Sequence, residues 1–139
     1  MLKRTIKYED FDGNEQEELF YFNISKPELI ALEVDHPKGF GAWMEEVMKA
    51  KDNKTLMEQF KRIVLLAYGE KSEDGRNFVK NDELKAKFES SAAYISLFTE
   101  LAMDDNAAAE FLLGVLPKDM TEESRKQMEA STAAPTPSV

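Results

Sequence analysis

The segment YGEKSEDGRNFVKNDEL, residues 68–84, separates two stretches of sequence that have the apolar spacing of helices. Gly69 is well placed to end the preceding helix in a left-handed conformation. Asp74-Gly75 is a turn signal, and Asn81 is a residue type that caps the start of a helix. The segment therefore predicts a long helix that ends near its first residue, a loop over residues 72–80, and another helix that begins at Asn81.

Helical spacing continues on both sides of this segment. The preceding helix is expected from about Lys54 to Tyr68, because its apolar residues form one stripe at i, i+3, i+4 spacing. The helix after Asn81 either continues to Leu101 or bends near Ser90-Ser91. Further helices are expected after a capping box at Ser25 and Glu28, over residues 40–50, and over residues 107–116 behind a cap within Asp104-Asp105-Asn106.

The N-terminal residues predict a β-hairpin. Apolar and polar residues alternate around Ile6 and Tyr8, and residues 19–24 are rich in strand-forming aromatic side chains. Between them, Asp12-Gly13-Asn14 is a turn in which Gly13 can take a positive φ. Both faces of the second strand are partly apolar, so the hairpin must pack on helices or pair with another strand.

The fold class that we predict is mainly α with an N-terminal β-hairpin, an α+β domain of about five helices. All 14 aromatic residues lie between Tyr8 and Phe111. We expect one globular domain over residues 1–117. Residues 118–139 contain too little apolar surface to offset their ordering entropy, so a disordered C-terminal tail is expected there.

The charge of the chain excludes several classes of partner. There are 27 acidic and 18 basic residues, and the net charge is −9. Nonspecific binding of nucleic acid or of an anionic membrane requires basic surface, so neither partner is expected. No apolar run is long enough to span a bilayer, and the N-terminus lacks the apolar core of a signal peptide.

The sequence does not predict an active site, a metal site or a cofactor. There is no cysteine, and the single histidine, His36, precedes a proline in a probable turn. Acidic pairs such as Glu45-Glu46 are better explained as helix surface than as catalytic carboxylates. We therefore expect a binding protein rather than an enzyme.

The candidates for a binding surface are apolar residues in the N-terminal half of the chain. Aromatic and methionine side chains at helical spacing recur on surfaces that accept apolar helices, although the same spacing is also typical of a core. These residues are expected to contact a partner or another copy of the chain: Phe20, Phe22, Trp43, Met44 and Met48.

The chain resembles the siphophage tail assembly chaperones of phages and prophages that infect Gram-positive bacteria. The resemblance covers residues 3–117. It is carried by IKYEDFDG (6–13), FYFNISKPEL (20–29), residues 68–80, AYISLFTELA (93–102) and AAEFLLGVLP (108–117), in that order and spacing.

This resemblance implies a chaperone for the tape measure protein, the long helical polypeptide that sets tail length. Such a chaperone coats that polypeptide in the host cytoplasm before tail tube subunits polymerise around it, and it is absent from the mature virion. The resemblance also implies self-association and a second, C-terminally extended form of the chain made by translational frameshifting. It implies no catalytic residue.

Two other functions remain compatible with a small acidic protein. One is a structural adaptor that stays in the virion, for example at the head–tail joint. The other is a regulator that mimics DNA and whose charge occupies a host protein. Charge-driven binding weakens steeply with ionic strength, whereas binding through apolar surface changes little.

Overall fold

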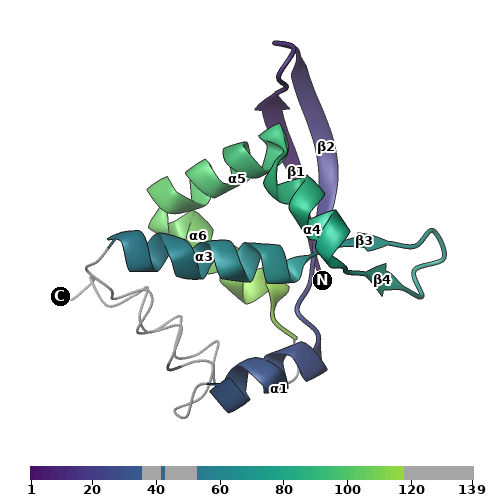
Figure 1. The fold of residues 1–139 in the computed structure, drawn as a ribbon, viewed down its shortest axis with the longest axis vertical. Coiled ribbons are helices and arrows are strands. Elements are labelled where there is room, and N and C mark those ends of the chain that lie inside the picture. Colours follow the sequence, from purple (N-terminus) through teal and green to yellow (C-terminus); the bar gives the residue numbers. More distant parts are fainter. Residues whose placement is uncertain (36–41, 43–52, 118–139) are drawn as a thin grey trace.

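A computed structural model describes residues 1–35, 42 and 53–117 of the 139 residues. Figure 1 shows the arrangement of the helices and strands. Along the chain they are β1 (Leu2–Glu9), β2 (Glu15–Phe22), α1 (Lys26–Asp35), α3 (Asn53–Ala67), β3 (Tyr68–Lys71), β4 (Phe78–Val79), α4 (Asp82–Glu89), α5 (Ala92–Met103) and α6 (Asp105–Val115).

The described residues confirm an α+β fold with five helices and an N-terminal hairpin, but the sheet is larger than predicted. Its four strands are antiparallel and follow the order β1-β2-β3-β4. The predicted loop over residues 72–80 is wrong at its end, because Phe78 and Val79 form β4. The predicted helix over residues 40–50 and the C-terminal tail lie outside the described residues.

The backbone conformation of Gly69, which follows the long helix, differs from the one that the sequence predicted. Among the described residues, positive φ angles occur only at Gly13 and Gly75, so Gly69 is not a left-handed cap. It lies in β3 instead, opposite Tyr21 of β2. A Cβ atom at Gly69 would lie 2.7 Å from Cε2 of Phe78 and 2.9 Å from the carbonyl oxygen of Val79. Glycine is therefore required here because β4 packs closely against β3.

The N-terminal hairpin pairs over its whole length, from Leu2 opposite Phe22 to Glu9 opposite Glu15. Asp10 builds its turn, because its side chain accepts hydrogen bonds from the backbone N–H of Asp12 (3.0 Å) and of Asn14 (2.9 Å). Gly13 takes a φ of 85° in this turn, as predicted. The second strand begins at Glu15, earlier than the aromatic residues alone predicted.

The helix N-caps predicted at Ser25, at Asn81 and within residues 104–106 are confirmed. Ser25 and Glu28 form a capping box, in which the Ser25 N–H donates to the Glu28 carboxylate (2.9 Å) and the Glu28 N–H donates to the Ser25 hydroxyl (3.3 Å). Asn81 caps α4 and Asp104 caps α6. The predicted bend is also found, since α4 ends at Glu89 and Ser91 caps α5.

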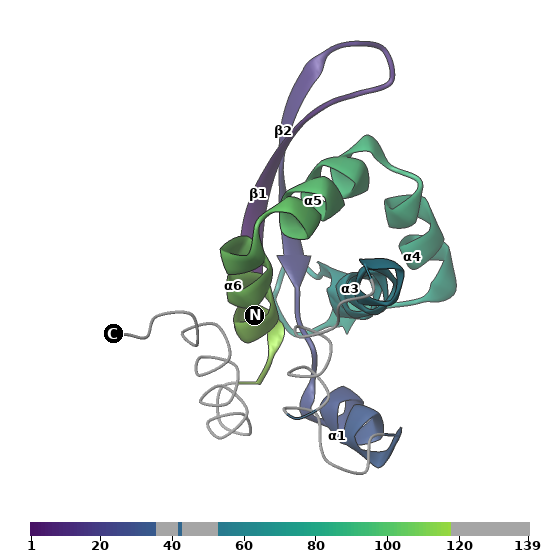
Figure 2. The same cartoon turned by 90° about the vertical axis from the view of Figure 1, so that its left-hand side faces the viewer.

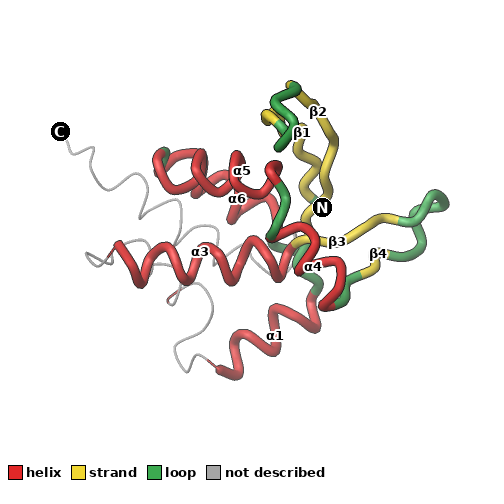
Figure 3. Tube along the Cα trace, turned by 45° about the horizontal axis from the view of Figure 1, so that its top comes forward, coloured by secondary structure: helices red, strands yellow, loops and turns green. Residues whose placement is uncertain are grey.

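One hydrophobic core joins the sheet to the helices. It contains side chains from β1, β2, β3 and all five helices, and α5 and α6 both contact β1. Figure 3 shows the helices grouped to one side of β1 and β2, while the β3–β4 hairpin projects away from them. Figures 1 and 2 agree that the tip of the β1–β2 hairpin and helix α1 lie at opposite ends of the described part of the molecule.

Candidate binding surfaces

The structure describes two of the predicted site residues, Phe20 and Phe22, and these two differ in burial. Phe22 is completely buried, and its ring lies 5.2 Å from that of Phe111 and 5.8 Å from that of Phe88. Phe20 is only partly buried at the edge of the same aromatic cluster, 5.5 Å from Phe88. The other three predicted residues lie outside the described residues: Trp43, Met44 and Met48.

The end of the molecule at α1 carries exposed apolar side chains. Leu29 and Leu32 of α1 are buried, but Ile30 is 50% exposed and Val34 is 78% exposed. Ile30 and Val34 are four residues apart, so they lie on the same side of the helix. Met57, near the start of α3, is also exposed. Met57 belongs to the apolar stripe predicted for the helix from Lys54 to Tyr68, and its expected burial is wrong because it lies near the start of α3, where the side chain is 45% exposed. Ile30 and Val34 were not among the predicted binding residues.

A partly buried lysine contacts the start of this helix. The ammonium of Lys80 donates to the carbonyl oxygens of Asn23 (2.6 Å) and Leu66 (2.7 Å) and to the Glu28 carboxylate (2.8 Å). Burial raises the pKa of Glu28, but the hydrogen bonds from Lys80 and Ser25 outweigh it and hold the pKa below the ordinary value of 4.5. Burial lowers the pKa of Lys80 although Glu28 opposes this shift. The orientation of α1 therefore depends on one ion pair.

The opposite end of the molecule is acidic. Residues 8–18, which form the distal part of the β1–β2 hairpin, contain six acidic and no basic residues. At the tip, Phe11 is 77% exposed within the turn that Asp10 holds. The hydrogen bonds from the Gln16 side chain and from backbone N–H groups lower the pKa of Asp10, so this carboxylate stays charged. The polar residues on both sides of Phe11 are the feature of the sequence that indicates an exposed ring at this turn.

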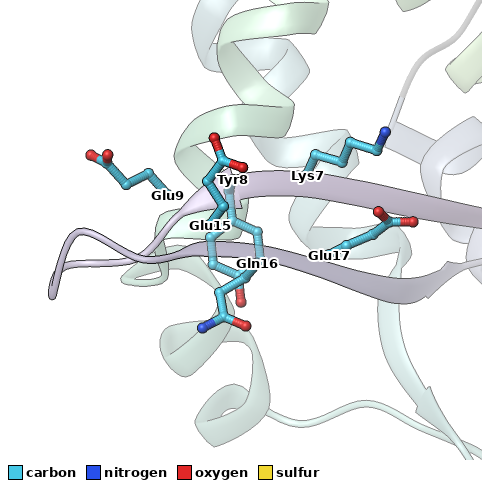
Figure 4. A pocket seen from close by; sticks show the side chains of 6 residues that line it. All are labelled: Lys7, Tyr8, Glu9, Glu15, Gln16 and Glu17. Carbon is cyan, nitrogen blue, oxygen red and sulfur yellow. The ribbon is translucent and has the colours of Figure 1, made fainter.

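Two open hollows lie on this hairpin. The first has a volume of about 510 Å³, and Figure 4 shows its lining residues, which place one ammonium among three carboxylates: Lys7, Tyr8, Glu9, Glu15, Gln16 and Glu17. The second, of about 460 Å³, lies between β1 and α5 and is lined by residues that include Arg4, Lys7, Ser96 and Glu100. Arg4 and Glu100 form an ion pair there. The excess of carboxylates in the first hollow favours a basic partner group.

The described residues contain no group of three or more histidine, cysteine, aspartate or glutamate side chains arranged to hold a metal ion. Within the same residues, no helix is long and apolar enough to cross a membrane. Two features of the described surface are candidates for binding a partner: an apolar end at α1, and an acidic hairpin that carries an exposed aromatic ring.

Residues 1–138 match the family model described as "Phage tail assembly chaperone". The chain belongs to this family. The match covers nearly the whole length of the chain and confirms the resemblance that the sequence analysis identified. No match of this tail assembly chaperone to a curated protein or to a solved structure was found.

Proposed function

We propose that this tail assembly chaperone binds the tape measure protein in many copies and keeps it soluble until the tail tube forms around it. The observation that carries the proposal is the family match over residues 1–138. The choice of the tape measure protein as the partner comes from the resemblance described above, and a physical argument supports it. A long helical protein with repeated apolar faces exposes patches that aggregate, and it is the component of a growing tail that most needs a cover.

The apolar end at α1 supports this function. Ile30 and Val34 leave apolar surface on a helix whose other side is anchored in the core. Two such side chains bind weakly, and weak binding suits a cover that tube subunits must displace. Many copies along one long partner supply the affinity that a single copy lacks. The net charge of −9 keeps the coated assembly soluble.

We assign further partner contacts to Phe20, Trp43, Met44 and Met48, or to contacts between copies of the chaperone. Phe22 supports Phe20 from within the core. Self-association along the tape measure protein, and a C-terminally extended frameshift form that shares the coat, belong to the same proposal. The assembly takes place in the host cytoplasm and requires no catalytic step, cofactor or nucleic acid.

Co-expression tests the proposal directly. The long protein encoded just downstream in the phage genome is expressed alone, with this chain, and with this chain plus its extended form. We expect the long protein to be insoluble alone and to become soluble and co-purify with the chaperone. If the chaperone and its extended form together leave it insoluble, the proposed function is wrong.

Two further measurements separate the other functions. Mass spectrometry of purified particles should not detect this chain, whereas a virion adaptor would be present at a fixed copy number. Binding to the tape measure protein should persist at 500 mM salt, since apolar contacts are little screened, whereas a DNA mimic would dissociate.

A further inference from the structure

Among the described residues, one edge of strand β2 is unpaired over most of its length. On one side, β2 pairs with β1 from Glu15 to Phe22. On the other side, β3 pairs only with Tyr21 and Phe22. Among the described residues, no strand lies beside residues 15–20 on that second side. Figure 1 shows this edge facing away from the helices.

The register identifies the backbone groups that point to the open side. The Asp10 N–H donates to the Asn14 carbonyl oxygen (2.8 Å), so these two residues form a hydrogen-bonded pair. Hydrogen-bonded and non-hydrogen-bonded pairs alternate along an antiparallel ladder. The even-numbered residues of β2 therefore bond to β1. Glu15, Glu17 and Leu19 direct their N–H and C=O groups away from it.

Two contacts support this assignment. Lys7 is opposite Glu17, and its carbonyl oxygen accepts a hydrogen bond from the Ser96 hydroxyl of α5 (2.9 Å), on the side of β1 that faces away from β2. Tyr21, the next odd-numbered residue of β2, is paired with Gly69 of β3 on the open side. On both strands of the hairpin, the odd-numbered residues therefore direct their backbone groups outward. Helix α5 covers only the β1 edge.

The side chains along the open edge decide which partner fits it. Charged side chains on an exposed edge discourage pairing with further copies. If two copies paired antiparallel with Glu17 opposite Glu17, Glu15 would lie opposite Leu19, and carboxylates would face each other at the centre. Lys7 lies opposite Glu17 within the hairpin, but this single ammonium is outnumbered by the carboxylates of Glu9, Glu15 and Glu17 that line the same hollow. The same carboxylates attract a strand that carries basic residues.

We propose that the open edge of β2 accepts an extended segment of a partner protein as an additional antiparallel strand. Basic side chains of that segment lie opposite Glu15 and Glu17, and an apolar side chain lies opposite Leu19, which is 51% exposed. From the N-terminus to the C-terminus of the partner segment, these positions give the pattern apolar-x-basic-x-basic. The backbone supplies the affinity and the side chains supply the selectivity. This binding mode does not depend on the tape measure protein as the partner.

The test uses the full-length ¹⁵N-labelled chain and two synthetic peptides with blocked ends. One peptide is Thr-Val-Thr-Lys-Thr-Lys-Thr, and its matched control has Glu in place of both Lys. We expect the basic peptide to shift the amide resonances of Glu15, Glu17 and Leu19 and to slow their hydrogen exchange. The amides of Gln16 and Glu18 already bond to β1 and should change little. Equal shifts for odd and even residues, equal binding of both peptides, or no binding of either at millimolar concentration would each overturn the proposal.

Two matched variants sharpen this test. N-methylation of the Val and both Lys of the peptide removes the N–H groups that face β2 and should abolish binding, whereas N-methylation of the two inner Thr residues should not. On the protein, the double substitution Glu15→Gln and Glu17→Gln should weaken binding roughly fivefold, because two cross-strand charge pairs are lost. If N-methylation at the two sets of positions has the same effect, the peptide does not bind as a strand.

Discussion

Lys80 links four segments that are distant in sequence. Its ammonium holds the end of β2 at Asn23, the end of α3 at Leu66 and the start of α1 at Glu28, from a position directly after β4. Lys80→Met keeps the apolar stem but leaves two carbonyl oxygens and a carboxylate without their donor. We expect a loss of about 2–3 kcal/mol in the free energy of unfolding, measured by urea denaturation.

An exposed ion pair provides the control for this substitution. Lys61 lies 2.6 Å from Glu89, but both side chains are more than 40% exposed. Such pairs contribute little, so Lys61→Met should cost clearly less than Lys80→Met. If the two substitutions cost the same, the Lys80 ammonium does not have the structural role that its hydrogen bonds to Asn23, Leu66 and Glu28 indicate.

The lowered pKa of Glu28 predicts a pH dependence of stability. A carboxyl whose pKa is lower in the folded state than in the unfolded state stabilises the fold above its unfolded pKa, here about 4.5. That contribution is lost as the pH falls through the lower, folded value. Glu28→Gln should therefore be less stable than the wild type at pH 7, and the difference should shrink below pH 4.5. Melting temperatures measured from pH 7 to pH 3 test this, and a constant difference over that range would contradict it.

At the scale of elements, the β3–β4 hairpin depends on a close contact at Gly69. Gly69→Ala would place a methyl group within 3 Å of the Phe78 ring and of the Val79 backbone, and the backbone cannot move without breaking β3–β4 pairing. We expect a loss of about 1–3 kcal/mol in the free energy of unfolding.

Gly114→Ala is the matched control, because it places a methyl group 3.0 Å from a side-chain carbon of Leu2, which is only partly buried and can rotate. Alanine also favours the helix at that position. Gly114→Ala should therefore cost clearly less than Gly69→Ala. Equal costs would show that the packing of Phe78 over β3 is not tight.

The break between α4 and α5 depends on local hydrogen bonds, so single substitutions there can measure the contribution of the cap to stability. The Ser91 hydroxyl accepts from the Tyr94 N–H (3.1 Å) and donates to the Phe88 carbonyl oxygen (2.6 Å). The neighbouring Ser90 hydroxyl donates to the carbonyl oxygen of Lys87, and this hydrogen bond is exposed. Ser91→Ala should cost about 1 kcal/mol through loss of the cap, and Ser90→Ala close to nothing. Circular dichroism during thermal unfolding compares the two, and the reverse order would contradict the assignment of the cap.

The helix caps and the first hairpin could be predicted because their signals are local. Ser25 with Glu28, Asn81 and Asp104 each satisfy backbone groups within three residues of themselves. The strands β3 and β4 could not be predicted in this way. Each is very short, and β3 exists because Tyr68 and Gly69 pair with the end of β2, more than 40 residues earlier in the sequence. In sequence alone, the same residues have the pattern of a helix end followed by a loop.

Over the whole molecule, the two ends differ in chemistry. The β1–β2 hairpin ends in an acidic tip that presents Phe11, and the opposite end presents Ile30 and Val34 of α1. Phe20 and Phe22 lie on the same face of β2, because side chains alternate along a strand, but this alternation does not determine how deeply each one is buried. The core closes over Phe22 from α4 and α6, and Phe20 remains at its edge. Which apolar residues stay on the surface is decided by tertiary packing.

The proposed function predicts that the apolar end contributes to solubilising the partner. Val34 is 78% exposed on α1, so Val34→Ser should change the free energy of unfolding by less than about 0.5 kcal/mol. Met103 at the end of α5 is 83% exposed and provides a control of similar exposure on another element. In co-expression, Val34→Ser should lower the soluble fraction of the tape measure protein, because each copy loses apolar contact and avidity multiplies the loss along the filament. Met103→Ser should leave that fraction unchanged. If both variants solubilise the partner as well as the wild type does, the chaperone binds through a different surface, and the contacts assigned to α1 are wrong.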